Sequence, residues 1–222
     1  MTFVSRLSAG SLLLALGCVA LSARPAHAEV LFSSMPFVDP GGFFIIGPNA
    51  TSFSTYQELA AQFTPGKTAT LDSIEMPFYH FKNSNDAVTI SLYTSVNNLP
   101  GVVLATQTIP ANTITSTGTI YTLNFGGSPL LTANTSYFVD AATTTDTVQT
   151  WNLSSPTVFV HAAQRSKNSG PFTAISDKNL AFRVNGTSIA AVPEPGSIAL
   201  LIGLGVSGAG FLARRRRTIN QA

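Results

Sequence analysis

The chain has 222 residues, of which 45% are hydrophobic and only 10% are charged, with 12 Lys and Arg, 10 Asp and Glu and a single Cys. Soluble domains usually carry about 25% charged residues, so this composition argues against a nucleic-acid binder, a coiled coil or a charged disordered tail. The formal net charge of +2 comes from the two ends, because the stretch from Glu29 to Val192 has a net charge of −3. That stretch has the length of one domain with a proper core.

The first 28 residues have the three zones of a secretory signal peptide. Arg6 supplies the positive charge, Ser11–Leu21 is a short apolar run, and Ala26 and Ala28 form an A-x-A site for signal peptidase around His27. The apolar run is short for a bilayer span. We therefore expect residues 1–28 to form a signal helix that is cleaved after Ala28.

The only cysteine, Cys18, leaves a lipoprotein as the alternative. In that interpretation Ala15-Leu16-Gly17-Cys18 is the lipid-attachment box, although the better-placed A-x-A site follows it. Ordinary cleavage would leave an exported domain without cysteine, which must fold without disulfides.

Residues 191–222 form a second terminal signal in three consecutive zones. Pro193, Glu194 and Pro195 make a stiff, extended break, because each proline fixes its own φ and disfavours helix before it. Gly196–Ala213 is an uncharged span of 18 residues. As a helix it would reach about 27 Å, close to the thickness of the hydrocarbon layer. The basic stop after it would stay cytoplasmic under the positive-inside rule, and it consists of Arg214, Arg215, Arg216 and Arg217.

This order of PEP motif, Gly-rich apolar span and terminal arginines resembles the PEP-CTERM sorting signal of Gram-negative bacteria that make exopolysaccharide. The resemblance implies processing by exosortase, a membrane cysteine transpeptidase-like enzyme, at or near the PEP motif. The span would then be a temporary anchor in the inner membrane, followed by release or attachment at the cell surface. The alternative is an ordinary tail-anchored protein, whose small residues at Gly203/Ser207 and Gly205/Ala209 let the helix pack on another membrane helix.

The exported stretch, residues 29–190, is rich in Thr, Ser, Asn and β-branched residues, and several segments alternate with period two. Turn sequences separate these segments, which predicts an all-β domain with the architecture of an antiparallel β-sandwich or jelly roll. Tyr56–Phe63 is the one stretch that fits either a helix or an edge strand. The predicted strands are Thr70–Phe81, Asp86–Thr94, Val102–Ile109, Thr119–Phe125, Ser136–Ala142, Val148–Leu153, Thr157–His161 and Leu180–Val184.

The same stretch resembles the choice-of-anchor domains that often precede PEP-CTERM tails. The pieces that carry this likeness are Gln57–Phe63, Leu71–Phe78, Val88–Gly101 and Leu180–Gly186. The resemblance implies a β-sandwich carried to the cell surface, and it brings no catalytic residues with it.

Catalytic and metal-binding patterns are weak in this stretch. His80 and His161 follow apolar residues at period two, which favours half-buried strand positions over a triad or a zinc site. Glycoside hydrolysis needs a pair of carboxylates, and the candidates are Asp72 with Glu75 or Asp140 with Asp146. Asp72 and Glu75 are three residues apart on a predicted strand, which predicts that they point to opposite faces. Whether Asp140 and Asp146 bind a calcium ion is left open. We assign no catalytic residue, metal or cofactor.

Carbohydrate contact is the more plausible chemistry, since aromatic rings pack against the apolar faces of sugars. Trp151 stands among polar residues and is the candidate glycan contact. The alternative is a core residue, because a lone Trp in a sandwich is more often part of the core. The other rings are Tyr79, Tyr93, Tyr121 and Tyr137, and the sites of the Asn-glycosylation pattern are Asn49, Asn134, Asn152 and Asn185.

Three functions follow, of which a non-enzymatic surface or matrix protein is favoured. Its expected partners are signal peptidase, exosortase, the inner membrane during sorting, and exopolysaccharide or biofilm, but no nucleic acid. The second is a carbohydrate-binding module that uses exposed aromatics such as Trp151. The third is a glycoside hydrolase-like enzyme.

Overall fold

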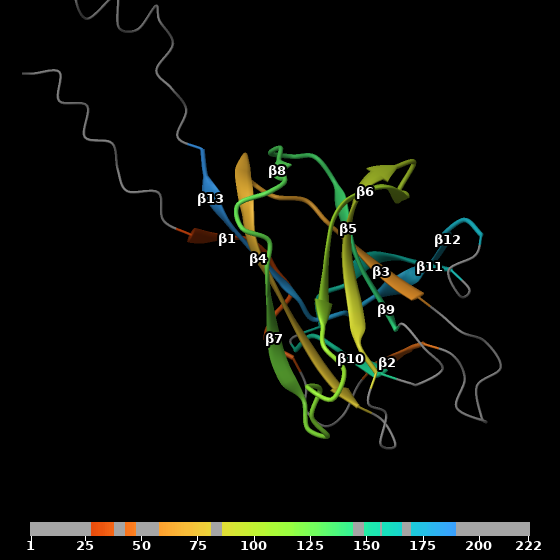
Figure 1. Ribbon diagram of the computed structural model, residues 1–222. Helices are drawn as coiled ribbons and strands as arrows, with labels where there is room; N and C mark the ends of the chain where they lie inside the picture. Colours follow the sequence, from red (N-terminus) through yellow and green to blue (C-terminus); the bar gives the residue numbers. More distant parts are fainter. Residues whose placement is uncertain are drawn as a thin grey trace, which may run out of the picture. The chain divides into compact units, whose positions relative to one another are not determined.

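The computed structural model describes residues 28–37, 43–47, 58–80, 86–143, 149–155, 157–165 and 170–189. Within these ranges the chain is all-β, and its thirteen strands form two antiparallel sheets in a sandwich-like arrangement (Figure 1). The predicted all-β sandwich is confirmed. The expected signal helix and the expected C-terminal membrane helix lie outside the described residues.

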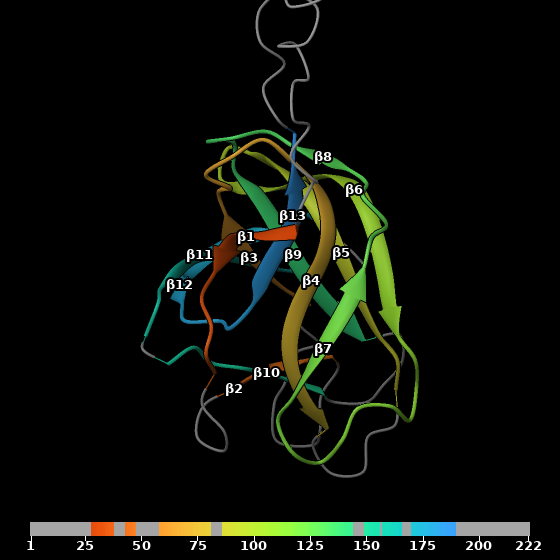
Figure 2. The ribbon, with the colours of Figure 1, turned by 90° about the vertical axis from the view of Figure 1, so that its left-hand side faces the viewer.

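The first sheet has seven strands, and β4 (Ala69–His80) is the one that joins them. One edge of β4 pairs first with β13 and then with β10, and the other edge pairs with β8 and β7. Figure 2 shows β4 running the full height of this sheet. The other strands are β1 (Ala28–Ser33), β2 (Phe43–Ile46), β7 (Thr119–Asn124), β8 (Leu130–Leu131), β10 (Gln149–Asn152) and β13 (Arg183–Ser188).

The second sheet has six strands in the order β12-β11-β3-β9-β5-β6. Their bounds are β3 (Glu58–Phe63), β5 (Val88–Val96), β6 (Leu99–Ile109), β9 (Tyr137–Thr143), β11 (Val160–Arg165) and β12 (Thr173–Lys178).

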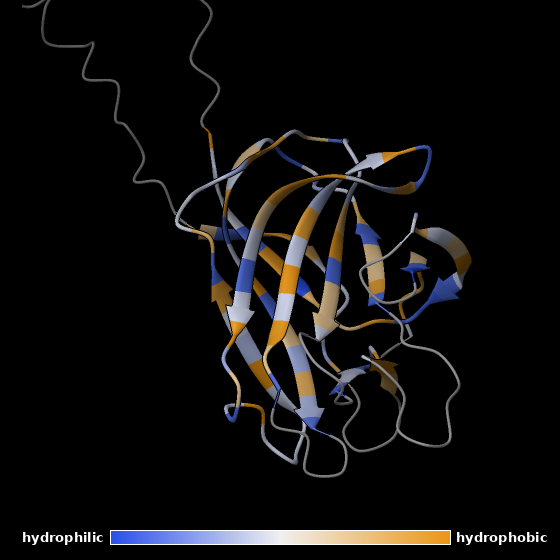
Figure 3. Ribbon diagram, turned by 45° about the vertical axis from the view of Figure 1, so that its right-hand side comes forward, coloured by the Kyte–Doolittle hydropathy of each residue, from blue (hydrophilic) through white to orange (hydrophobic). Residues whose placement is uncertain are grey.

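Alternating side chains build the core between the two sheets. On β5 the side chains of Val88, Ile90 and Leu92 are all fully buried, as the period-two pattern predicts. The same alternation buries Phe182 and Val184 on either side of the partly exposed Arg183. The resulting bands of hydrophobic and hydrophilic residues are visible along the strands in Figure 3.

The stretch that fits either a helix or an edge strand is an interior strand. Residues 58–63 form β3, which is hydrogen-bonded to β9 on one side and β11 on the other. Ala60 and Ala61 point to opposite faces, and both are fully buried. The small side chains of Ala60 and Ala61 let other residues cover both faces of β3. The polar residues Glu58 and Gln62 in the same strand make this interior position hard to predict from the sequence.

The other predicted strands are present with shifts of a few residues at their ends. The strands that the sequence pattern did not predict are β1, β2, β8 and β12. β8 has only two residues, and on β12 buried positions do not alternate with exposed ones, so neither strand shows a period-two pattern.

A β-bulge at Asp72 changes which residues of β4 face the core. Leu71 pairs with Gly186 and Ser73 pairs with Asn185, so Asp72 is the extra residue between them. As a result Leu71 and Ile74, three residues apart, are both fully buried.

Gly186 lies opposite this bulge, where a side chain has no room. A Cβ atom at Gly186 would be 2.4 Å from the Thr70 carbonyl oxygen and 2.6 Å from Leu31 Cδ1. Glycine therefore allows β13 to approach both β4 and the side chain of Leu31 on β1.

We predict that Gly186→Ala lowers the free energy of unfolding by about 1–3 kcal/mol, because overpacking forces strands or side chains apart. Gly66→Ala is the matched control, since a Cβ atom there meets nothing within 4 Å. Denaturant unfolding, followed by the fluorescence of the buried Trp151, measures both. Equal stability of the two variants would contradict the steric role of Gly186.

Candidate functional site

The residues predicted to direct sorting lie almost entirely outside the described residues. This holds for Ala26, for Pro193, Glu194 and Pro195, for the span Gly196–Ala213 and for the basic stop, Arg214, Arg215, Arg216 and Arg217. Ala28 is the exception. It is the first residue of β1 and pairs with Thr187 on β13.

The two ends of the sandwich therefore meet on neighbouring strands. Glu29, the residue after the expected signal-peptidase site, pairs with Gly186, and β13 ends two residues later at Ser188. Pro193 follows Ser188 by five residues.

Trp151 belongs to the core. Its exposed fraction is 0%, its indole Nε1 donates a hydrogen bond of 2.8 Å to the Ala181 carbonyl oxygen, and its ring packs against Phe78 and Phe182. A buried indole with its N–H satisfied has no face for a sugar. This corrects the interpretation of Trp151 as a glycan contact and agrees with the alternative that it is a core residue.

Of the four tyrosines considered as sugar contacts, two are also buried. Tyr93 and Tyr137 have little exposed area, whereas Tyr79 and Tyr121 are partly exposed. The Tyr79 ring makes an edge-on contact with Phe43, with 5.4 Å between ring centroids. Phe43 is itself 38% exposed, so this pair presents an exposed aromatic surface of the kind that a sugar could pack against.

Asp72 and Glu75 do not point to opposite faces, because the bulge at Asp72 shifts the alternation. Thr187 Oγ1 donates to Asp72 Oδ2 at 2.7 Å, and Asn185 Nδ2 donates to Glu75 Oε1 at 2.8 Å. Thr187 and Asn185 share one face of β13, so both carboxylates lie on the outer face of the seven-stranded sheet. Glu75 also pairs with Arg183 at 3.0 Å. Both acids on β4 are therefore held by polar side chains of the neighbouring strand β13.

Asp140 is brought close to Glu58, and its suggested partner Asp146 lies outside the described residues. Ala60 on β3 pairs with Asp140 on β9, so Glu58 is the diagonal neighbour of Asp140 on the same face of the six-stranded sheet. Glu58 has an exposed fraction of 0% and Asp140 of 1%. The guanidinium of Arg165 on β11 pairs with Glu58 and donates to the Tyr93 hydroxyl at 3.3 Å.

The environment of these acids favours a neutral Asp140. Burial raises the pKa of Asp140 well above its usual value of 3.8, the nearby charge of Glu58 raises it further, and Arg165 opposes both effects. Asp140 Oδ1 is buried without a hydrogen-bond partner among the described residues. Burial, and then the charge of Asp140, likewise raise the pKa of the Tyr93 hydroxyl.

Sequence reasoning missed this acid pair, although it had considered Asp140. The available signal is an acidic residue inside a strand with apolar neighbours on both sides, at Phe138-Val139-Asp140-Ala141-Ala142. Its partner could not be found, because β3 and β9 are separated by more than seventy residues. The side chain of Phe172 covers this face together with Tyr93 and Phe138, so the carboxyl groups have almost no surface that a substrate could reach.

Both histidines are partly buried strand residues, as expected. His161 Nδ1 lies 3.2 Å from Asp177 Oδ1, and its ring makes an edge contact with Phe138. His80 ends β4, and its backbone N–H donates to the Thr115 carbonyl oxygen. Within the described ranges no three His, Cys, Asp or Glu side chains are grouped so that they could hold a metal ion.

Comparison with known families gives a match for the residues that follow the last strand of the sandwich. Residues 191–217 match the model of the PEP-CTERM protein-sorting motif. The chain carries a PEP-CTERM sorting motif. No curated protein matches the chain.

The PEP-CTERM motif places the protein among exported substrates of exosortase that are sorted to the cell surface. The matched residues include the PEP tripeptide, the apolar span and the four arginines. In the part of the chain that the structure describes, there is no helix with the length and apolar character needed to span a membrane. The expected span, Gly196–Ala213, lies outside that part.

The buried acid makes the stability of this PEP-CTERM protein depend on pH. The folded-state pKa of Asp140 lies above its unfolded value, so its contribution is fully present below about pH 3.8 and is lost as the pH rises through the raised pKa. We predict that the free energy of unfolding of the wild type falls, relative to Asp140→Asn, as the pH rises above about 3.8.

Urea unfolding at a series of pH values measures this difference. Asp177→Asn is the control for removal of an exposed carboxylate, since the Asp177 side chain is 59% exposed and exposed ion pairs contribute little to stability. Parallel stability profiles for the wild type and Asp140→Asn would show that Asp140 ionises in the folded protein as it does in the unfolded chain.

Proposed function

We propose that this protein is a non-enzymatic surface protein of a Gram-negative bacterium, which exosortase releases from a temporary C-terminal anchor and which then associates with exopolysaccharide in a biofilm matrix. The observation that carries the proposal is the sorting motif at residues 191–217. Signal peptidase would first cut after Ala28, and the inner membrane would hold the chain until the second cleavage near Pro195.

The sandwich is compatible with both cleavages. A cut after Ala28 removes only the Ala28–Thr187 pair and leaves the rest of β1 hydrogen-bonded to β13, from Glu29 to Ser33. A cut near the PEP motif leaves β13 intact, because this strand ends at Ser188. Every buried residue of the main core lies between Leu31 and Val184, so neither cut removes a core side chain.

A binding or structural role is favoured over catalysis by the state of the acids. Glu58 and Asp140 are buried. Asp72 accepts a hydrogen bond from Thr187, and Glu75 is engaged by Asn185 and Arg183. An acid pair for glycoside hydrolysis needs two carboxyl groups that face one substrate. The described acids do not supply that arrangement.

The processing step is tested by the intact mass of the protein recovered from its host, with and without exosortase. We predict a chain that begins at Glu29 and ends near Pro195 only when exosortase is present. The double variant Glu194→Gln/Pro195→Ala should retain the C-terminal arginines in most molecules, because it removes the motif that the enzyme recognises.

The matched control is Glu75→Gln, which removes a carboxylate from the sandwich and should be processed like the wild type. A wild-type chain that keeps Arg214–Arg217 in both strains would refute sorting and leave a tail-anchored protein. A start upstream of Glu29, at a lipid-modified Cys18, would support the lipoprotein alternative.

Association with the matrix requires a separate measurement. We predict that the processed protein co-sediments with exopolysaccharide purified from the same host, and that Phe43→Ala reduces the bound fraction several-fold if the Phe43–Tyr79 surface takes part. Phe159→Ala is the control, since Phe159 is an exposed ring outside that pair. A protein that stays entirely in the supernatant would contradict the matrix role without affecting the sorting step.

A further inference from the structure

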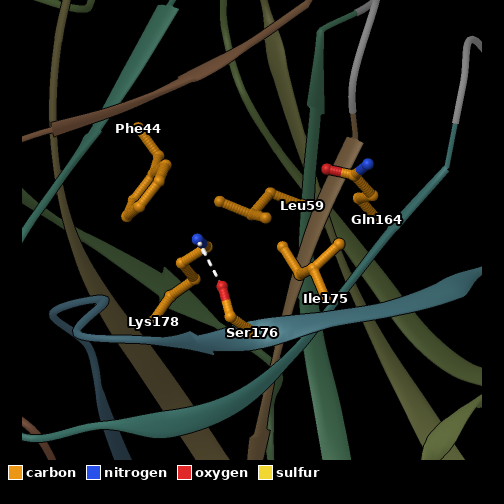
Figure 4. A pocket seen from close by; sticks show the side chains of 6 residues that line it. All are labelled: Phe44, Leu59, Gln164, Ile175, Ser176 and Lys178. Atoms are coloured by element: carbon orange, nitrogen blue, oxygen red, sulfur yellow. Dashed lines mark hydrogen bonds between the residues drawn. The ribbon is translucent and has the colours of Figure 1, made fainter.

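A pocket of about 410 Å³ opens between the two sheets where β2 lies near β3, β11 and β12. This volume is within the range of small-molecule sites, roughly 300–1,000 Å³. Phe44, Leu59 and Ile175 supply apolar walls, and Gln164, Ser176 and Lys178 supply the polar groups. Figure 4 shows Leu59 and the end of Lys178 directed into the same central space, with Phe44 facing them.

Lys178 differs from the other basic residues that the structure describes. Lys67 pairs with Glu29, Arg165 with Glu58 and Arg183 with Glu75. The Lys178 ammonium has no carboxylate partner in the described ranges. It lies 5.0 Å from the centroid of the Phe44 ring and donates a hydrogen bond of 3.0 Å to Ser176 Oγ.

An ammonium without a carboxylate partner among the described residues, next to apolar walls, suits an anionic ligand with an apolar part. Since the nearest acid in sequence, Asp177, is engaged with His161, Lys178 gives the pocket its positive charge. A carboxylate can accept hydrogen bonds from the ammonium and from the Ser176 hydroxyl, whose proton is free to donate while its oxygen accepts from Lys178. The apolar walls then cover whatever is attached to that carboxylate.

We propose that this pocket binds a small carboxylate with an apolar body, such as a short alkyl chain. The carboxylate pairs with Lys178 and Ser176, and the alkyl chain packs against Phe44, Leu59 and Ile175. A sugar acid fits less well, because the ammonium already occupies one face of the Phe44 ring and because three of the six lining side chains offer no partner for hydroxyl groups. The proposal does not depend on exosortase.

The test uses the full-length protein in non-ionic micelles with labelled methyl groups on Leu and Ile, titrated with sodium hexanoate. The methyl signals of Leu59 and Ile175 should shift to saturation. In Lys178→Met, which keeps an apolar stem and removes the charge, half-saturation should require about ten-fold more hexanoate. Lys67→Met is the matched control, because Lys67 does not line the pocket, and it should bind like the wild type.

Two further probes separate charge from apolar contact. Hexanol should shift the same methyl groups equally in the wild type and in Lys178→Met, which also shows that the variant pocket is intact. Absence of hexanoate shifts, or equal hexanoate binding by Lys178→Met and Lys67→Met, would overturn the proposal. Saturable shifts with glucuronate but not with hexanoate would overturn it in favour of an acidic sugar.

Discussion

Both edges of β4 are hydrogen-bonded, and the seven-stranded sheet depends on this double pairing. β13 and β10 share one edge, β8 and β7 share the other, and β1 and β2 join only through β13 and β10. The bulge at Asp72 lets so long a strand turn Leu71, Ile74 and the residues beyond them toward one core. Gly186 accommodates the bulge from the opposite strand. The sheet therefore depends on one irregular position whose two sides come from distant parts of the chain.

The six-stranded sheet is covered on both faces, which explains its unusual chemistry. Its inner face joins the main core, whereas its outer face carries the cluster of Ala60, Tyr93, Phe138, Ala163 and Phe172. Arg165 compensates the charge of Glu58 within that cluster, and its guanidinium lies 4.5 Å from the centroid of the Phe172 ring. Asp140 has no comparable compensation, so burial favours its neutral form. The net stabilisation from such a pair is small, because the cost of desolvating the charges offsets their attraction.

The pairing of β1 with β13 connects the fold to sorting. Both strands lie at one edge of the seven-stranded sheet, so the N-terminal and C-terminal limits of the sandwich are adjacent. Both proposed cleavages would leave the main core intact, because its residues lie between Leu31 and Val184. The pocket at Lys178 involves two other edge strands, β2 and β12, so the proposed ligand site does not include β1 or β13.

The sorting motif and the all-β fold class could both be predicted from the amino-acid sequence alone. The motif is a contiguous run of residue types, and strands such as Val88–Val96 show the period-two pattern in their own sequence. The sequence did not reveal the interior position of Glu58–Phe63, the burial of Trp151 or the common face of Asp72 and Glu75. These depend on which strands pair, on what covers the outer face of a sheet and on a bulge that breaks the alternation. The partnership of Glu58 with Asp140, like the pocket at Lys178, was decided only by the tertiary structure, because it arises from residues that are distant in the chain and meet only when the strands are in register.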